Sequence, residues 1–397
     1  MNFIFISPQF PTNYWNFCAQ LKADGVNVLG IGDAPYDSLV LGLKNALTEY
    51  YRVDSMENYD QMLRAVAYFT FKYGKIDWLE SNNEYWLEQD ARLREDFNIG
   101  HGFRPAEMAK IKSKYAMKRY YREAGLAAPA CIPADNWEAA RKFAQRYGYP
   151  LILKPDSGVG AQDTFTIQRD EDLQEFFEQK HSQAFVLEQY VDGQICSYDA
   201  IIDSRGEPIF ESGNITPIPI MDIVNNRDSA YFYIVKSLAD DVRDAGRRCV
   251  KAFDVKSRFI HFEFFRLKRE YEDLGKAGTI IGLEVNMRPS GGFTPDMLNY
   301  ANSVNVFKIW ADMVAFDSSK VDQQKQHFFC AYVGRRNHKA YKHSHVELLS
   351  RYRANITMSD RLPEVLAAAM GDQMYLAKFS EEKEMQEFFD YVLDREA

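Results

Sequence analysis

The sequence is short of basic charge, of cysteine and of long apolar runs. Its 397 residues carry a formal net charge of −9 and no cluster of lysine and arginine, which argues against nucleic acid or an anionic membrane as a partner. Five cysteines lie far apart without a CxxC pair, which argues against a disulfide framework and a zinc ribbon. The first apolar run has only the length of a strand, so we expect no signal peptide and no transmembrane segment. A cytoplasmic location fits these absences.

Several signatures of known chemistry are missing as well. No G-x-G-x-x-G follows the first expected strand, so a dinucleotide-binding interpretation fails at its most diagnostic point. The chain has no G-x-S-x-G, and none of its cysteines stands in a setting typical of a nucleophile. His343 and His345 form an H-x-H pair, but no full ligand set surrounds them, which favours a polar surface turn over a metal site.

Apolar residues make up 46% of the chain, enough for a globular protein of two or three domains. Through the first hundred residues strand and helix patterns alternate, which predicts parallel βαβ units. A lysine-rich helix is expected within 105–130, ending at Gly125, and a strand, a glycine loop and a strand within 149–167. Residues 196–290 are rich in strands around one helix at 237–253, and a third α/β segment begins near 325. We expect α/β and α+β units with boundaries at 1–104, 105–185, 186–322 and 323–397.

The stretch "GLEVNMRPSGG", 282–292, alternates polar and apolar residues strictly. In a strand this places Glu284, Asn286 and Arg288 on one face. Such a face is costly to bury without partners, and the Pro-Ser-Gly-Gly turn that follows lets the backbone approach a ligand closely. The pattern indicates a binding face.

A second strand, "RFIHFEFFRL", places Glu263 among phenylalanines, and a charged connector, 268–278, joins it to the strand of Glu284. A hairpin would set Glu263 beside Glu284, where two carboxylates repel unless a cation lies between them or one is protonated. With Asn286 they form an oxygen-only set suited to Mg²⁺. The alternative is a pair of surface ion pairs with Arg266 or Arg288. His261 is interpreted as a packed residue rather than a catalytic one.

Two further motifs point to a nucleotide. Lys154 ends an apolar strand before a loop with Gly158 and Gly160, where backbone N–H groups could surround an anion, although most such loops are hairpins. In "VLEQYVDG", the backbone at Glu188 and Val191 could bind a purine edge, or simply end a strand.

In this order the motifs resemble the ATP-grasp superfamily, from about residue 105 to 315, and most of all its single-copy members that are similar to the carbamoyl-phosphate synthase large chain. The resemblance implies a Rossmann-like pre-ATP-grasp domain, a two-subdomain ATP-grasp fold and a small C-terminal α/β segment. It assigns Lys114 and Lys154 to phosphate, Glu188 and Val191 to adenine, and Arg288 to the transferred phosphate. The remaining assignments are the covering loop with Ser157, Gly158 and Gly160, the metal ligands Glu263, Glu284 and Asn286, and the substrate-carboxylate turn Ser290, Gly291 and Gly292.

Three departures from the family pattern stand out. The acidic residue that often holds the ribose is missing after Gly193, where Gln194 and Ile195 follow. Asp199 on the next strand matches another commonly acidic position of the family, and the resemblance assigns it to the nucleotide-binding residues, with its exact role open. Ser113 replaces a frequent Asp before the first lysine. The gap between Glu263 and Glu284 is longer than usual.

The resemblance implies an ATP-dependent, ADP-forming ligase that uses Mg²⁺ (or Mn²⁺), activates a small carboxylate as an acyl phosphate and joins it to an amine. The alternatives are another ATP-grasp enzyme, of carboxylase or phosphotransferase type, and a non-catalytic ATP-binding regulatory protein. The resemblance also suggests a homodimer, because many members of the family form one. The proline-containing stretch 212–232 is expected to line the acceptor site.

Overall fold

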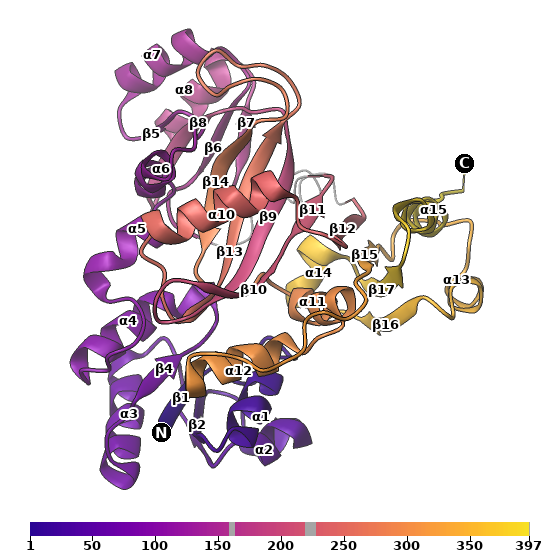
Figure 1. Ribbon diagram of the computed structural model, residues 1–397. Helices are drawn as coiled ribbons and strands as arrows, with labels where there is room; N and C mark the ends of the chain where they lie inside the picture. Colours follow the sequence, from indigo (N-terminus) through magenta and orange to yellow (C-terminus); the bar gives the residue numbers. More distant parts are fainter. Residues whose placement is uncertain (159–162, 219–227, 397) are drawn as a thin grey trace.

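The computed structural model describes residues 1–158, 163–218 and 228–396 (Figure 1). In this part of the chain no helix combines the length and the apolar character needed to cross a bilayer. The strands form three sheets, one near the N-terminus, one small and one large.

The N-terminal sheet is parallel, as the alternating pattern predicted. Its strand order is β3-β2-β1-β4, and all three pairings are parallel. The strands are β1 (Asn2–Ile6), β2 (Asn27–Gly32), β3 (Glu49–Arg52) and β4 (Trp78–Glu80), with helices α1 (Trp15–Ala23), α2 (Leu41–Ala46), α3 (Tyr59–Tyr73) and α4 (Leu87–Asp96). The sequence did not predict the short α2 and β3. Because the strands are parallel, their carboxyl ends meet at one edge, and this edge faces the rest of the molecule.

The expected lysine-rich helix is two helices, which corrects the prediction. α5 (Met108–Lys112) and α6 (Lys114–Glu123) are separated at Ser113, which has an extended ψ of 116°. The Ser113 hydroxyl accepts a hydrogen bond from the Ala116 N–H and so caps α6. The break places Lys114 in the first turn of a new helix.

The small sheet is antiparallel with the order β5-β8-β6-β7. Its strands are β5 (Cys131–Pro133), β6 (Leu151–Pro155), β7 (Phe165–Ile167) and β8 (Phe185–Gln189), accompanied by α7 (Trp137–Tyr147) and α8 (Asp170–Glu178). The glycine loop joins β6 to β7. Its Gly160, which the resemblance assigns to phosphate, lies outside the described residues.

The large sheet has the order β14-β13-β9-β11-β12-β15-β17-β16. β10 also belongs to it and pairs with β9. Its strands are β9 (Gly193–Ile202), β10 (Pro208–Ser212), β11 (Asn214–Thr216), β12 (Ala230–Ile234), β13 (Arg258–Leu267), β14 (Ile280–Asn286), β15 (Phe329–Arg335), β16 (Ile356–Arg361) and β17 (Gln373–Phe379). Strands from the third α/β segment therefore continue this sheet through the β12–β15 pair. The helices after β12 are α10 (Asp240–Ala252), α11 (Thr294–Asn302), α12 (Val306–Phe316), α13 (His345–Arg351), α14 (Glu364–Met370) and α15 (Glu382–Leu393).

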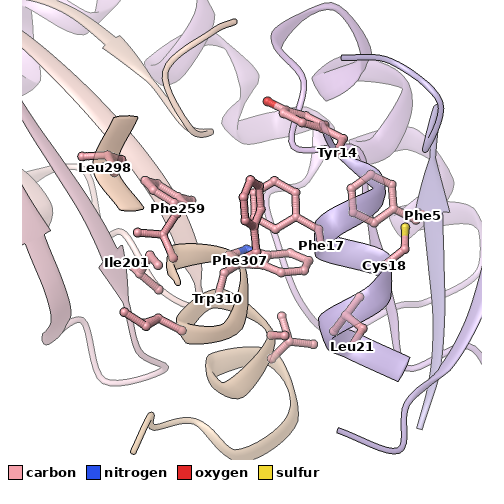
Figure 2. Close-up of a cluster of buried hydrophobic side chains, with 14 of the residues drawn as sticks. Phe5, Tyr14, Phe17, Cys18, Leu21, Ile201, Phe259, Leu298, Phe307 and Trp310 are labelled. Atoms are coloured by element: carbon pink, nitrogen blue, oxygen red, sulfur yellow. The ribbon is translucent and has the colours of Figure 1, made fainter. Parts of the chain in front are cut away.

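An aromatic cluster joins the N-terminal sheet to the large one (Figure 2). The Phe17 ring of α1 lies 4.8 Å from the Phe307 ring and 4.9 Å from the Trp310 ring, both on α12. On the other side of α12, Ile201 of β9 and Phe259 of β13 complete the cluster. Each such side chain contributes on the order of 1.5–3 kcal/mol when buried. The cluster thus joins one face of the N-terminal sheet to the large sheet, with α12 between them.

Candidate functional site

Three neighbouring strands align a polar row across the large sheet. In β13, His261 lies opposite Asn286 of β14 on one side and opposite Asp199 of β9 on the other. Two residues on, Glu263 lies opposite Glu284 and Ser197. Residues at even spacing share one face of a strand, so these side chains form a single surface. The pairing predicted from the sequence, Glu263 beside Glu284, is confirmed.

The opposite face of these strands belongs to the core. Phe262, Phe264, Val285 and Met287 are buried in one cluster with α6 and α10, as the alternation predicted. The register shifts just after the Glu263–Glu284 pair, since Phe264 lies opposite Gly282, and this leaves Leu283 as the extra residue of a bulge. A Cβ on Gly282 would lie 2.3 Å from the Tyr121 ring, so glycine is required there. The bulge ends the regular pairing beside the two carboxylates.

His261 is the centre of the polar row. Its Nδ1 lies 2.8 Å from Asp199 Oδ1 and its Nε2 lies 3.0 Å from Glu263 Oε1. Burial opposes a charged imidazole, but the two carboxylates outweigh burial and raise the pKa of His261 to about 10. The side chain is buried and held from both nitrogens, which agrees with its interpretation as a packed residue. Asp199 therefore orients His261, and His261 in turn fixes Glu263.

The phosphate lysine predicted on β6 has a buried partner. Lys154 Nζ lies 2.8 Å from Glu188 Oε1 on β8, and Lys118 Nζ lies 2.7 Å from Glu188 Oε2. Burial disfavours a charged carboxylate at Glu188, yet the two lysines prevail and lower its pKa. Lys118 also donates to the Leu283 carbonyl at 3.0 Å, in the bulge before Glu284. The network ties β6, β8, α6 and β14 together, and it gives Glu188 a side-chain role that the sequence did not suggest.

The other predicted phosphate lysine reaches the carboxylate row. Lys114 Nζ lies 3.5 Å from Glu284 Oε1 and donates to the Gly158 carbonyl at 3.4 Å. Its backbone N–H donates to the Asp156 carbonyl at 2.8 Å. Lys114 therefore lies between the start of the glycine loop and β14.

Asp156 fastens the glycine loop to the start of α6. Its Oδ1 accepts from the Ser113 hydroxyl at 3.0 Å and from the Tyr115 N–H at 2.9 Å. A carboxylate at a helix N-terminus is favourable because it satisfies free N–H groups and opposes the helix dipole. The acidic residue that the family often has just before the lysine is thus replaced in space by Asp156. Ser157 and Gly158 follow directly.

Arg288 connects the row to the N-terminal unit. Its Nη2 donates to Asn286 Oδ1 at 3.0 Å and its Nη1 to the Pro289 carbonyl at 2.7 Å. Its Nε lies 3.6 Å from Glu84 Oε2, just beyond the carboxyl end of β4. Burial is the main cause that raises the pKa of Glu84, and Arg288 opposes it.

The turn after Arg288 also meets the N-terminal unit. Asn13 Nδ2 donates to the Gly292 carbonyl at 3.3 Å and to Asp296 Oδ2 at 2.6 Å. Ser290 and Gly291 precede this contact, and the Thr294 hydroxyl donates to the Gly291 carbonyl at 2.8 Å. The predicted substrate turn thus lies at the carboxyl edge of the N-terminal sheet.

Sequence reasoning missed Lys118, Asp156 and Glu84. Lys118 stands four residues after Lys114, so the two share a helix face, a signal that was available. Asp156 directly follows the predicted phosphate strand. Glu84 carried no signal, because only the packing of the N-terminal unit brings it to Arg288.

The oxygen donors of the row fit a magnesium ion. Glu263 and Glu284 supply two carboxylates and Asn286 an amide oxygen, a hard set that leaves room for water and phosphate oxygens. Among the described residues no group of three or more His, Cys, Asp or Glu side chains is placed to hold a metal ion.

The chain is similar to proteins with ATP-grasp domains. Residues 111–215 match the family model of the ATP-grasp domain. The L-arginine-specific L-amino acid ligase of Bacillus subtilis is 21% identical over 65% of this chain and 62% of its own length. The C-terminal section of the carbamoyl phosphate synthase large chain of Aquifex aeolicus is 23% identical over 39% of this chain and 30% of its own. The chain thus spans less than two thirds of these curated relatives.

Solved structures extend the likeness to the whole fold. An L-amino acid ligase from Bacillus licheniformis has a TM-score of 0.70 at 14% sequence identity. The superposition covers 98% of this chain and 97% of the ligase chain. The biotin carboxylase domain dimer of the Hydrogenobacter thermophilus 2-oxoglutarate carboxylase, with MgADP and bicarbonate, has a TM-score of 0.68 at 13% identity, covering 99% and 90%. This chain contains an ATP-grasp domain and has the fold of the ATP-grasp ligases.

Proposed function

We propose that the chain is an ATP-dependent, ADP-forming ligase, which activates a small carboxylate as an acyl phosphate and joins it to an amine. One observation carries the proposal: cations from three separate segments lie around the Glu263–Glu284 row. Lys114 lies 3.5 Å from Glu284, Arg288 donates to Asn286, and Lys154 pairs with Glu188 of β8. The match to the ATP-grasp domain and the similarity to an L-amino acid ligase support it.

The proposed roles follow from charge. Lys114 and Lys154 bind the phosphates, together with the loop backbone at Ser157, Gly158 and Gly160. Glu263, Glu284 and Asn286 hold Mg²⁺ (or Mn²⁺), which neutralises phosphate charge when bound. The backbone at Glu188 and Val191 binds adenine.

The carboxylate, the triphosphate and the developing transition state are all anionic, so catalysis rests on positioning and neutralisation rather than on a protein nucleophile. A carboxylate oxygen attacks the γ-phosphorus of ATP, the bond to the β-phosphate oxygen breaks, and ADP leaves. The amine then attacks the acyl carbon, phosphate leaves, and the amine loses a proton. In this proposal Arg288 stabilises the transferred phosphate.

The substrate side is proposed at the carboxyl edge of the N-terminal sheet, where Ser290, Gly291 and Gly292 receive the carboxylate. Two buried polar atoms in this region, Asn13 Oδ1 and Asn82 Nδ2, have no hydrogen-bond partner among the described residues. Glu84 Oε2 makes the ion pair with Arg288 but no hydrogen bond. Leaving such atoms unpaired is costly, and a polar ligand would satisfy them. Glu84 gives this region a carboxylate suited to an amine. The earlier expectation for 212–232 concerns a stretch whose residues 219–227 lie outside the described part.

Three other functions would use the same site. A carboxylase-type enzyme is favoured by the similarity to the biotin carboxylase domain, and it would require bicarbonate for ADP release. A phosphotransferase would yield a stable phosphorylated product. A regulatory protein would bind Mg²⁺-ATP without turnover. The proposal extends to a homodimer, by analogy with that solved dimer.

Release of ADP and phosphate from Mg²⁺-ATP tests the proposal. The full chain is incubated with pools of amino acids, dipeptides and small carboxylates, and active pools are divided. We expect release that requires one carboxylate and one amine, with a joined product visible by mass spectrometry. Release that depends on bicarbonate alone, or tight ATP binding with no release in any pool, would contradict the ligase proposal.

A further inference from the structure

The long connector between β13 and β14, residues 268–279, folds back on the predicted adenine linker. Tyr271 and Gly275 exchange two backbone hydrogen bonds of 2.9 and 3.0 Å, which close the connector into a compact loop. Leu274 of the loop is buried with Val191 of the linker in a small cluster of its own, to which Leu267 and Ile281 also belong. The connector is therefore packed against the linker and does not project into solvent as an isolated loop.

Polar contacts hold the linker at both of its ends. At the far end, the Asp192 N–H donates to the Tyr271 hydroxyl at 2.7 Å, and the Lys268 N–H donates to the Asp192 carbonyl at 3.1 Å. At the near end, Gln189 Nε2 donates to Asp273 Oδ1 at 3.3 Å. Both Tyr271 and Asp273 belong to the connector.

Gln189 is itself fixed to a third segment. Its backbone N–H donates to the Ala130 carbonyl at 2.9 Å, and its side-chain Oε1 accepts from the Ala130 N–H at 3.2 Å. The near end is thus fixed without the connector, whereas both backbone hydrogen bonds of Asp192 within the described residues are made with the connector. Val191 lies directly before Asp192, so its position depends on that second anchor.

We propose that the connector is a part of the nucleotide site, in which Tyr271 is a positioning residue for the linker. Its hydroxyl fixes the Asp192 amide and thereby the neighbouring backbone of Val191, which would bind adenine. The connector thus determines affinity for adenine nucleotides and leaves the chemical step untouched. This inference rests on the proposed use of ATP, though not on which carboxylate or amine reacts.

Binding of Mg²⁺-ADP to the full chain, measured by isothermal titration calorimetry, tests the inference. Tyr271→Phe keeps the ring and its packing and removes only the hydroxyl. One hydrogen bond to a neutral amide corresponds to an affinity change of about three- to tenfold, and we expect the Kd for ADP to rise by that factor. The KM for ATP should rise in parallel, while kcat and the KM values of the other substrates stay within about twofold of the wild type.

Tyr59→Phe is the matched control. Tyr59 donates to Asp96 at 2.6 Å in the N-terminal unit, so this variant also loses a tyrosine hydroxyl and its hydrogen bond, but away from the linker. It should leave the Kd for ADP unchanged. Asp273→Ala, at the end that has its own anchor, should weaken ADP binding less than Tyr271→Phe does.

Equal ADP affinity in Tyr271→Phe and the wild type would overturn the inference, even with the ligase activity established. A fall of kcat with unchanged ADP affinity would overturn it as well. The ligase proposal fails separately, if the wild type binds ADP and releases none from ATP in any substrate pool.

Discussion

Glu263 and Glu284 lie directly opposite each other on β13 and β14, and a different cationic side chain lies beside each carboxylate. His261 contacts Glu263 and Lys114 approaches Glu284. Cross-strand like charges destabilise a sheet unless something compensates them. The pair is therefore maintained by the charges around it.

Removing Glu188 should destabilise the fold more than removing the whole charge pair does. Glu188→Ala leaves Lys118 and Lys154 buried without their carboxylate, at an expected cost of about 3–5 kcal/mol in the free energy of unfolding. The double variant Lys118→Met/Glu188→Gln retains volume and removes one charge of each sign, so it should be less destabilised. Urea denaturation measures both, and equal losses would contradict the account of this network.

Asp156 should affect Lys114 through the start of α6. Asp156→Ala removes the acceptor of the Ser113 hydroxyl and the Tyr115 N–H, which should cost about 1 kcal/mol of stability. We expect it also to raise the KM for ATP several-fold, because Lys114 loses its fixed position. Asp156→Asn, which keeps an oxygen acceptor, is the control and should change the KM less. Steady-state kinetics would contradict this role if both variants had the wild-type KM.

Asp90 should make stability depend on pH. Burial is the main cause that raises its pKa to about 7, opposed by Arg94 and reinforced by Glu80. In the unfolded chain the pKa is about 3.9. Between these values the folded protein holds a proton that the unfolded chain has lost, so the free energy of unfolding falls as pH rises, by at most about 1.4 kcal/mol per pH unit.

Asp90→Asn cannot ionise, so this variant should lose the part of the decline that Asp90 causes. Urea denaturation of both proteins at pH 5, 6, 7 and 8 measures it. The wild-type curve should fall more steeply than that of the variant. Parallel curves would show that Asp90 does not titrate in this range.

The sequence predicted what local pattern and register determine. The alternation in β14 and the phenylalanine-rich β13 were sufficient to place Glu263 beside Glu284, because strands have a period of two. The sequence did not predict the break at Ser113, because a serine within a lysine-rich run is compatible both with the interior of a helix and with a helix cap. Nor could it place Glu84 against Arg288, because that contact depends on how α12 packs between the N-terminal and large sheets. Contacts of this kind depend on long-range packing, which the periodicity of a sequence does not reveal.

Release of ADP from Mg²⁺-ATP by Glu284→Ala, beside the wild type, decides whether the Glu263–Glu284 row is a metal and phosphate site. Ile195→Ala is the control, at the position where the family's ribose acid is missing. Loss of a ligand that neutralises phosphate charge should lower turnover by at least about 100-fold in Glu284→Ala with the fold retained, and Ile195→Ala should do far less. Turnover of Glu284→Ala within about threefold of the wild type would contradict the assignment.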